Sequence, residues 1–461
     1  MTTAAPAVRF PDARLAAVAA AACGLGASAA LTGSASLSLP LLFAGGALLA
    51  AGAILVLAGQ WLPPLVVLAA VLPLPPLFST ELVRLSPAFA MTVLLALAWG
   101  LRNAADGGRA PALPAAFPRR SAMLLLAAVL AAAAFGAQPE SAMRETVNWV
   151  LALALLVIAT RQLTASPQLA RSLALAVAAT AAVAGVLAVW QSLGLLPGQF
   201  PISGSAFYRA SLGFGWPNEL GVFLALSLPF AVYAIETAPS RSARIAGAAG
   251  ALALGLGLLA TFSRGSWLAV LLAPAVLLAG GGGRVAVRVW CCALLIALLG
   301  DVLTGGALRA RIGMTVGDWV IEQRAALTLA GLLMVAAHPL LGVGPGGFAA
   351  SLEQYGPQIG WLWDYLPTAQ NGYVQMAAET GLIGLAALLL FFAAVFRSLL
   401  RGARAARHSP AGPLSRAALW SFATALLLAG NEWVFAHGLV QLVMLTASLG
   451  ITASIRAPER P

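Results

Sequence analysis

Long apolar segments recur along the chain from Leu15 to Ile455, separated by short polar or arginine-containing stretches. A helix needs roughly 20 mostly apolar residues to cross the hydrocarbon core of a bilayer, so segments of this kind are candidate spans. The pattern predicts an all-α, polytopic integral membrane protein with about 12–14 transmembrane helices, in a single membrane domain over residues 1–461. The candidate spans lie near 15–33, 37–59, 61–79, 85–101, 121–137, 146–160, 172–195, 216–236, 245–262, 265–280, 289–305, 376–396, 415–430 and 438–455.

Composition excludes a water-soluble enzyme, because 61% of the residues are hydrophobic and only 9% are charged, whereas soluble domains carry about 25% charged residues. The net charge of +11 would favour a nucleic-acid partner in a soluble protein. Here the arginines fall mostly in loops between apolar segments, so we expect membrane lipid and no nucleic acid as a partner. The cysteines, Cys23, Cys291 and Cys292, lie in apolar segments at neither disulfide nor metal-ligand spacing.

The arginine-rich loops alternate with loops that hold fewer basic residues, and cytoplasmic loops are enriched in arginine and lysine. This predicts that both chain ends and the arginine-rich loops face the cytoplasm, and that 306–375 is the one long extracytoplasmic loop. Within it, residues 325–337 are helical in pattern but too short to span, so we expect them to lie along the interface or to re-enter the membrane. The arginines that define the cytoplasmic side are Arg102, Arg109, Arg119, Arg120, Arg161, Arg171, Arg241, Arg244, Arg284, Arg288, Arg397, Arg401, Arg404, Arg407 and Arg416.

Three arginines stand on the side that the charge pattern disfavours, namely Arg209, Arg264 and Arg324. Charged groups at a membrane boundary are costly, so their presence there requires a reason. Guanidinium groups can bind a diphosphate through paired hydrogen bonds without a metal ion. The alternative is that each extends to water or pairs with a nearby carboxylate.

His338 begins a glycine-rich stretch that ends at Phe348, and its glycines allow a tight turn after a helix end. Such a turn can present backbone N–H groups to an anion. It follows no predicted strand, so it matches neither a nucleotide-binding loop nor a dinucleotide fingerprint. His338 is either a general base or, as isolated histidines at helix ends more often are, a capping or hydrogen-bonding residue.

A polar stripe follows the loop, because Asn371, Gln375 and Glu379 are four residues apart and share one face of a helix that enters the membrane. A stripe of this kind requires either a cavity, which the adjoining loop favours, or an interhelical hydrogen-bonded seam. Three residues of the last extracytoplasmic turn provide a second polar edge: Asn431, Glu432 and His437. The candidates for substrate binding are Arg324, Asn218, Gln370, Asn371, Tyr373 and Glu379.

Four segments in order, 209–218, 261–267, 324–348 and 371–384, resemble the O-antigen ligase/polymerase superfamily of bacterial envelope glycosyltransferases. The resemblance covers residues 200–390. It implies an enzyme of polysaccharide and lipopolysaccharide biosynthesis in the bacterial inner membrane, with its active site facing the periplasm. The implied donor is a glycan on undecaprenyl diphosphate, used with no cofactor, metal or nucleotide sugar.

One position departs from the family pattern. Ligases of this family resemble one another in a His-Asn pair followed by a Gly-x-x-Gly, with the histidine implicated in catalysis. Asn371, Gly381 and Gly384 match, but Gln370 stands at the histidine position, and glutamine cannot act as a general base. Either His338, Glu379 or His437 replaces it, or no residue deprotonates the acceptor, or the protein is not a ligase.

The leading hypothesis is therefore transfer or polymerisation of glycan, with Arg209 and Arg264 stabilising the departing diphosphate and His338 as the candidate base. The acceptor is a glycan, the lipid A core or a protein, and the sequence does not choose among them. The alternatives are a membrane transporter, although the internal repeat common in transporters is not visible, and a scaffold of an envelope assembly complex that has lost its catalytic activity.

Overall fold

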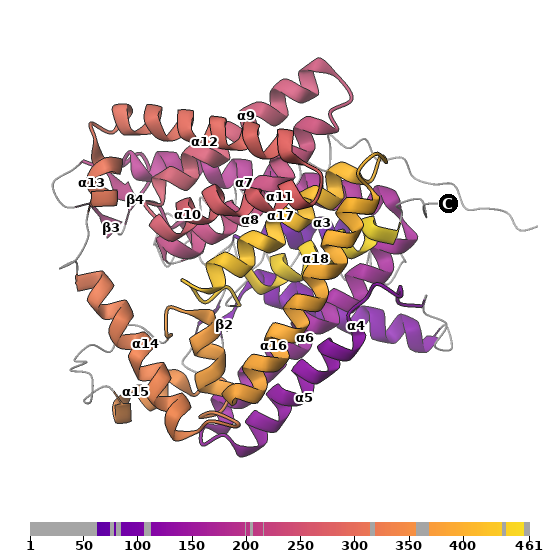
Figure 1. Cartoon of the computed structure of the whole chain (residues 1–461), viewed down its shortest axis with the longest axis vertical. Helices are drawn as coiled ribbons and strands as arrows, with labels where there is room; N and C mark the ends of the chain where they lie inside the picture. The colour runs from indigo at the N-terminus through magenta and orange to yellow at the C-terminus, as the bar shows by residue number, and fades with distance from the viewer. Residues whose placement is uncertain are drawn as a thin grey trace, which may run out of the picture.

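The computed structural model describes residues 62–73, 78–79, 84–105, 112–198, 200–202, 206–214, 216–313, 319–355, 368–435 and 439–455. Within these ranges the chain is an assembly of helices with only two short two-stranded antiparallel sheets, which confirms the predicted all-α class (Figure 1). The spans predicted at 15–33 and 37–59 lie outside the described residues.

The first part of the chain forms α3 (Leu62–Val71), β1 (Phe78–Ser79), β2 (Arg84–Leu85), α4 (Pro87–Ala105), α5 (Arg119–Phe135), α6 (Pro139–Ala165), α7 (Pro167–Ser192), β3 (Phe200–Pro201), β4 (Tyr208–Arg209), η1 (Leu212–Phe214), α8 (Pro217–Glu236) and α9 (Arg241–Ala260). The second part forms α10 (Arg264–Leu272), η2 (Ala273–Ala275), α11 (Val276–Ala279), α12 (Gly283–Leu303), α13 (Ala307–Gly313), α14 (Trp319–Ala337), α15 (Phe348–Tyr355), α16 (Gly372–Ala405), α17 (Gly412–Ala429) and α18 (Leu439–Ile455).

Seven helices in the described part of the chain are long and apolar enough to cross a membrane: α4, α6, α7, α8, α9, α12 and α16. Two shorter apolar helical segments, 264–279 and α18, coincide with further predicted spans. The 325–337 segment is part of the longer α14, which begins at Trp319 and is not among the candidate spans. The protein is thus a polytopic α-helical membrane protein.

The core lies where α6, α7, α8, α16, α17 and α18 pack together, and it is built mainly from alanine, leucine and phenylalanine side chains. Small residues allow close helix contact, as membrane helices require. Gly185 on α7 and Gly257 on α9 face each other so closely that an added methyl group on either would overlap the backbone of the opposite helix. α12 packs less deeply, at the edge of the molecule beside α9 (Figure 1).

Arginine-rich connections meet at one end of the helix bundle. Arg404 donates a hydrogen bond to the carbonyl of Ala279, and Arg416 forms an ion pair with Glu236. This side holds the C-terminal ends of α8, α11 and α16 and the N-terminal end of α17. The candidate site residues Asn218, Arg264, Asn371 and Asn431 lie at the opposite ends of these helical segments. The arrangement therefore separates the arginine-rich loops from the candidate site by the length of the bundle.

Helix α16 is broken at Gly381, whose backbone adopts φ 67° and ψ −175°. The glycine-rich turn after α14 fills the break, because Val343 and Gly344 donate their N–H groups to the carbonyls of Ala378 and Glu379. In return, Leu382 donates to the carbonyl of Pro339. The break lies about 14 Å along the helix from its first residue, Gly372, and irregular backbone at membrane depth is tolerated where protein buries it. This favours the re-entrant interpretation of the α14 segment.

Candidate functional site

Arg209 lies in β4 and is fixed by two elements that are distant in sequence. Its Nε donates to the carbonyl of Thr261 at 3.2 Å, and its Nη2 donates to Oδ1 of Asn218 at 2.9 Å. Thr261 is the C-cap of α9, and Asn218 lies in the first turn of α8. The guanidinium group thereby connects the strand to the ends of two helices and faces the region where α10 begins.

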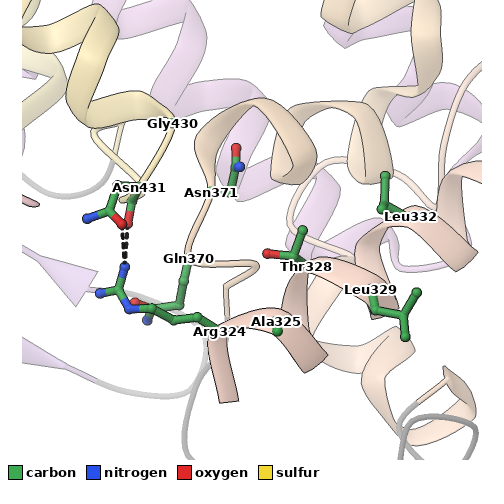
Figure 2. Close-up of a pocket in the computed structure, with 9 residues that line it drawn as sticks. All are labelled: Arg324, Ala325, Thr328, Leu329, Leu332, Gln370, Asn371, Gly430 and Asn431. Atoms are coloured by element: carbon green, nitrogen blue, oxygen red, sulfur yellow. Dashed lines mark hydrogen bonds between the residues drawn. The ribbon is translucent and has the colours of Figure 1, made fainter. Parts of the chain in front are cut away.

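Arg324 lies in the first half of α14 and binds the turn after α17. Its Nη1 donates to the backbone carbonyl of Asn431 at 2.8 Å and to Oδ1 of Asn431 at 3.0 Å (Figure 2). Its Nη2 meets Oε1 of Glu432 at 2.6 Å. The predicted second polar edge therefore includes Asn431 and Glu432. His437 lies outside the described residues.

Positive charge accumulates around Arg209. Burial, the largest cause, and the positive charges of Arg311, Arg324 and Arg264 together lower the pKa of the Arg209 guanidinium to about 10, while the carboxylate of Glu432 acts in the opposite direction. Burial also raises the pKa of Glu432, while Arg324 and Arg209 act in the opposite direction. We call Arg209, Arg264, Arg311 and Arg324 the arginine cluster. The guanidinium groups of Arg264, Arg311 and Arg324 all act on Arg209, beside the Glu432 carboxylate, and such a region is suited to a multiply charged anion.

Arg311 was not among the residues predicted to bind substrate, although it lies in the predicted loop. Asn431, which binds Arg324, also packs against the start of α10. An added methyl group at Gly265 would overlap the amide of Asn431. Arg264 is the first residue of α10, so its guanidinium adds to the positive end of that helix dipole.

A pocket of about 430 Å³ opens beside Arg324, between α14, the start of α16 and the end of α17 (Figure 2). Its polar side is formed by Arg324, Gln370, Asn371 and Asn431. Its apolar side follows one face of α14, where Leu329 and Leu332 are about half exposed. The pocket is lined by Arg324, Ala325, Thr328, Leu329, Leu332, Gln370, Asn371, Gly430 and Asn431.

Backbone strain marks the same region. Among the described residues, the non-glycine residues with positive φ are Leu212, Phe262 and Gln370. Leu212 follows Arg209 by three positions, Phe262 precedes Arg264 by two, and Gln370 lines the pocket. Such conformations cost of order 1–3 kcal/mol each and cluster at functional sites, so the geometry supports the location of the site independently of its charge.

The remaining predicted substrate-binding residues separate into two groups. Asn218 contacts Arg209, and Asn371 lines the pocket while its Oδ1 accepts the N–H groups of Tyr373 and Val374 as the N-cap of α16. Tyr373 instead points to α17, donating its hydroxyl to the carbonyl of Leu426. Glu379 is 5% exposed and does not line the pocket.

His338 is exposed and directly follows α14, whereas Arg324 lies near the start of that helix. At a rise of 1.5 Å per residue, the two residues are separated by about 21 Å along the helix axis. The structure therefore brings Arg209, Arg264, Arg324 and Asn218 together but does not bring His338 to them. The glycine-rich turn was expected to present backbone N–H groups to an anion. In the structure, the N–H groups of Gly346 and Phe348 instead donate to the side chain of Glu379 on α16.

No group of three or more histidine, cysteine, aspartate or glutamate side chains suited to a metal ion occurs within the described ranges. A comparison with protein families matches residues 249–389 to the family described as O-antigen ligase. A comparison with curated proteins found no match. The family match confirms the predicted resemblance to the O-antigen ligase/polymerase superfamily, and it includes Arg264, Arg311, Arg324 and Gln370. The described part of the chain also contains seven helices long and apolar enough to cross a membrane, so the matched region lies within a multi-pass membrane protein.

Proposed function

From the O-antigen ligase region at residues 249–389, we propose that the protein transfers or polymerises glycan from an undecaprenyl-diphosphate-linked donor at the periplasmic face of the inner membrane. The observation that carries this proposal is the arginine cluster. Residues from β4, α10, α13 and α14 converge there on the side of the bundle opposite the arginine-rich loops. A diphosphate attached to a membrane lipid fits both the charge and the apolar wall of the adjoining pocket.

In the proposed reaction, an acceptor hydroxyl attacks the anomeric carbon and the bond to the diphosphate breaks. Negative charge then develops on the leaving diphosphate, where preorganised donors lower the barrier most. Arg209 and Arg264 supply this stabilisation, and Arg324 holds the pocket side of the donor. Arg209 stays protonated at neutral pH, because its pKa is still about 10.

The acceptor is proposed to react without a strong general base. Among the described residues that line the pocket, none is an aspartate, glutamate or histidine. Gln370 and Asn371 can orient an acceptor hydroxyl by hydrogen bonds, and the proton leaves to the diphosphate or to water as the bond forms. This mechanism accounts for glutamine at the position where the family pattern has histidine.

The broken helix α16 also invites comparison with transporters, whose broken helices face a substrate cavity at mid-membrane. Here the protein's own glycine-rich turn occupies the break, and the freed carbonyls of Ala378 and Glu379 bind N–H groups of that turn. Glycan transfer is therefore the function that the geometry supports better.

The proposal is tested with purified protein in liposomes that contain an undecaprenyl-diphosphate-linked glycan. We expect glycan to move to an added acceptor, and we expect transfer to persist in EDTA because arginines supply the positive charge that a metal would otherwise provide. Cells that lack the protein should accumulate the lipid-linked glycan. An unchanged lipid-linked glycan profile, or a loss of transfer in EDTA that added metal restores, would contradict the proposal.

The proposed orientation is tested by cysteine labelling. A cysteine introduced near Tyr355 should react with a membrane-impermeant reagent in intact spheroplasts, because the charge pattern predicts that the 306–375 loop faces the periplasm. A cysteine in the connection between α16 and α17, residues 406–411, should react only after lysis. The reverse result at both positions would remove the basis for a periplasmic site.

A further inference from the structure

Two buried polar residues, Gln375 and Glu379, lie behind the pocket rather than in its wall, and the mechanism above gives them no task. They are 3% and 5% exposed. Gln375 accepts the N–H of Ala369 through Oε1 at 2.6 Å, and it donates from Nε2 to Oε1 of Glu379 at 2.6 Å. The Glu379 carboxyl also accepts the N–H groups of Gly346 and Phe348.

These contacts connect the start of α16 and the residues just before it to the glycine-rich turn, which lies earlier in the sequence. At one end is Ala369, which directly precedes the pocket residues Gln370 and Asn371. At the other end is the glycine-rich turn that fills the break in α16. Gln370 has φ 54°, a conformation that a non-glycine residue keeps only when its surroundings impose it. The bond from Ala369 to Gln375 is a contact that can impose it.

We propose that Gln375 and Glu379 act as positioning residues, a hydrogen-bonded brace that fixes the Ala369–Asn371 turn of the pocket against the glycine-rich turn. The expected effect on transfer rests on the proposed function, but the existence of the brace does not. Burial makes the brace sensitive to the pattern of donors and acceptors, because an unpaired polar group in the interior costs the full desolvation penalty.

Exchanging the two side chains, by Gln375→Glu together with Glu379→Gln, tests this pattern of donors and acceptors. In Glu379→Gln the new amide must direct its NH2 group either at the Gln375 amide or at the N–H groups of the glycine-rich turn, so one donor loses its acceptor. In Gln375→Glu two carboxyl groups meet. In the double variant, Glu at position 375 accepts from both Ala369 and the new amide, while the Gln at position 379 still accepts from the turn. All the bonds of the brace are then kept.

We expect each single variant to lower kcat by about tenfold to a hundredfold, as small misplacements of positioning groups do. The KM for the donor should change much less, because the arginine cluster lies on other elements. The double variant should recover most of the wild-type rate. Thr380→Val is the matched control, since the buried Thr380 hydroxyl bonds only the carbonyl of Met376 in its own helix, and it should leave transfer unchanged.

Hydrogen–deuterium exchange of the purified protein tests the brace without relying on the proposed activity. The peptide that contains Ala369 should exchange faster in each single variant than in the wild type, and the double variant should restore protection. Single variants with unchanged exchange, or a double variant no better than the poorer single variant, overturn the brace whatever the protein catalyses. If the double variant does not fold, exchange in Glu379→Gln alone decides. Intact brace behaviour without transfer would instead contradict the proposed function.

Discussion

Replacement of Arg209 or Arg264 by alanine is expected to lower glycan transfer about a hundredfold to a thousandfold, the usual loss when a well-placed electrostatic donor is removed from a transition state. The leaving diphosphate carries its charge wherever the acceptor proton goes, so this expectation does not depend on the identity of a base. Arg209→Lys and Arg264→Lys should also be poor, because an ammonium group cannot bind two phosphate oxygens in the planar geometry of a guanidinium group.

Two variants serve as controls for these substitutions. Arg309→Ala removes an arginine of the same loop region whose side chain is 81% exposed and paired with Asp301, so it should retain nearly full transfer. His338→Ala should be mild, because α14 separates His338 from Arg324 by about 21 Å. Each variant is assayed after size-exclusion chromatography shows it to be folded. Folded Arg209→Ala and Arg264→Ala proteins with near-normal transfer would refute the diphosphate-binding interpretation.

Several residues of the candidate site could be proposed from the sequence, because charge on the side of a membrane that the arginine pattern disfavours is costly. Arg209, Arg264 and Arg324 stand out for that reason alone, and the structure places all of them together. The same reasoning identified Asn431 and Glu432 as a polar edge, and both bind Arg324. Many helix positions were predictable from the period and length of apolar segments. The span predicted at 61–79 was not, because α3 ends at Val71 and β1 covers Phe78–Ser79.

Other features could not be predicted, because they depend on tertiary contacts that leave no local pattern. Arg309 and Arg311 are two positions apart in α13, so they face different directions, and only the fold shows which one joins the cluster. Gln375 and Glu379 share a helix face whether that face meets a cavity or a turn. Here it meets a turn, so for these two residues the hydrogen-bonded seam describes the structure better than the cavity.

The positive φ angles of Leu212, Phe262 and Gln370 could not be predicted from the sequence either. These residues are neither glycine nor asparagine, so their identity gives no signal of a left-handed conformation. Gly381 is different: the sequence shows it as part of a Gly-x-x-Gly, but it does not show that the helix breaks there.

Gly381→Ala is expected to give the second large effect, a loss of folded protein. At φ 67° and ψ −175°, a backbone region that essentially only glycine occupies, an alanine costs about 1–3 kcal/mol. Its methyl group would also overlap the carbonyl of Leu340, a backbone atom that can move only with the whole turn. Overpacking typically adds about 1–3 kcal/mol, so we expect a marked fall in the yield of monodisperse protein and in Tm.

The partner glycine provides a second variant. Gly342 has φ 68°, and its added methyl group would overlap the backbone of Ala378 and Glu379, so Gly342→Ala should behave in the same way. Gly100→Ala is the matched control, because Gly100 lies within α4 with no atoms within 4 Å of an added methyl group. In a helix interior that change is worth up to about 1 kcal/mol in favour of alanine. If Gly381→Ala and Gly342→Ala both keep the wild-type Tm, the glycine-rich turn does not fill the break in α16. Glu379 would then lack its hydrogen bonds to the glycine-rich turn, and the proposed brace would lose one of its two ends.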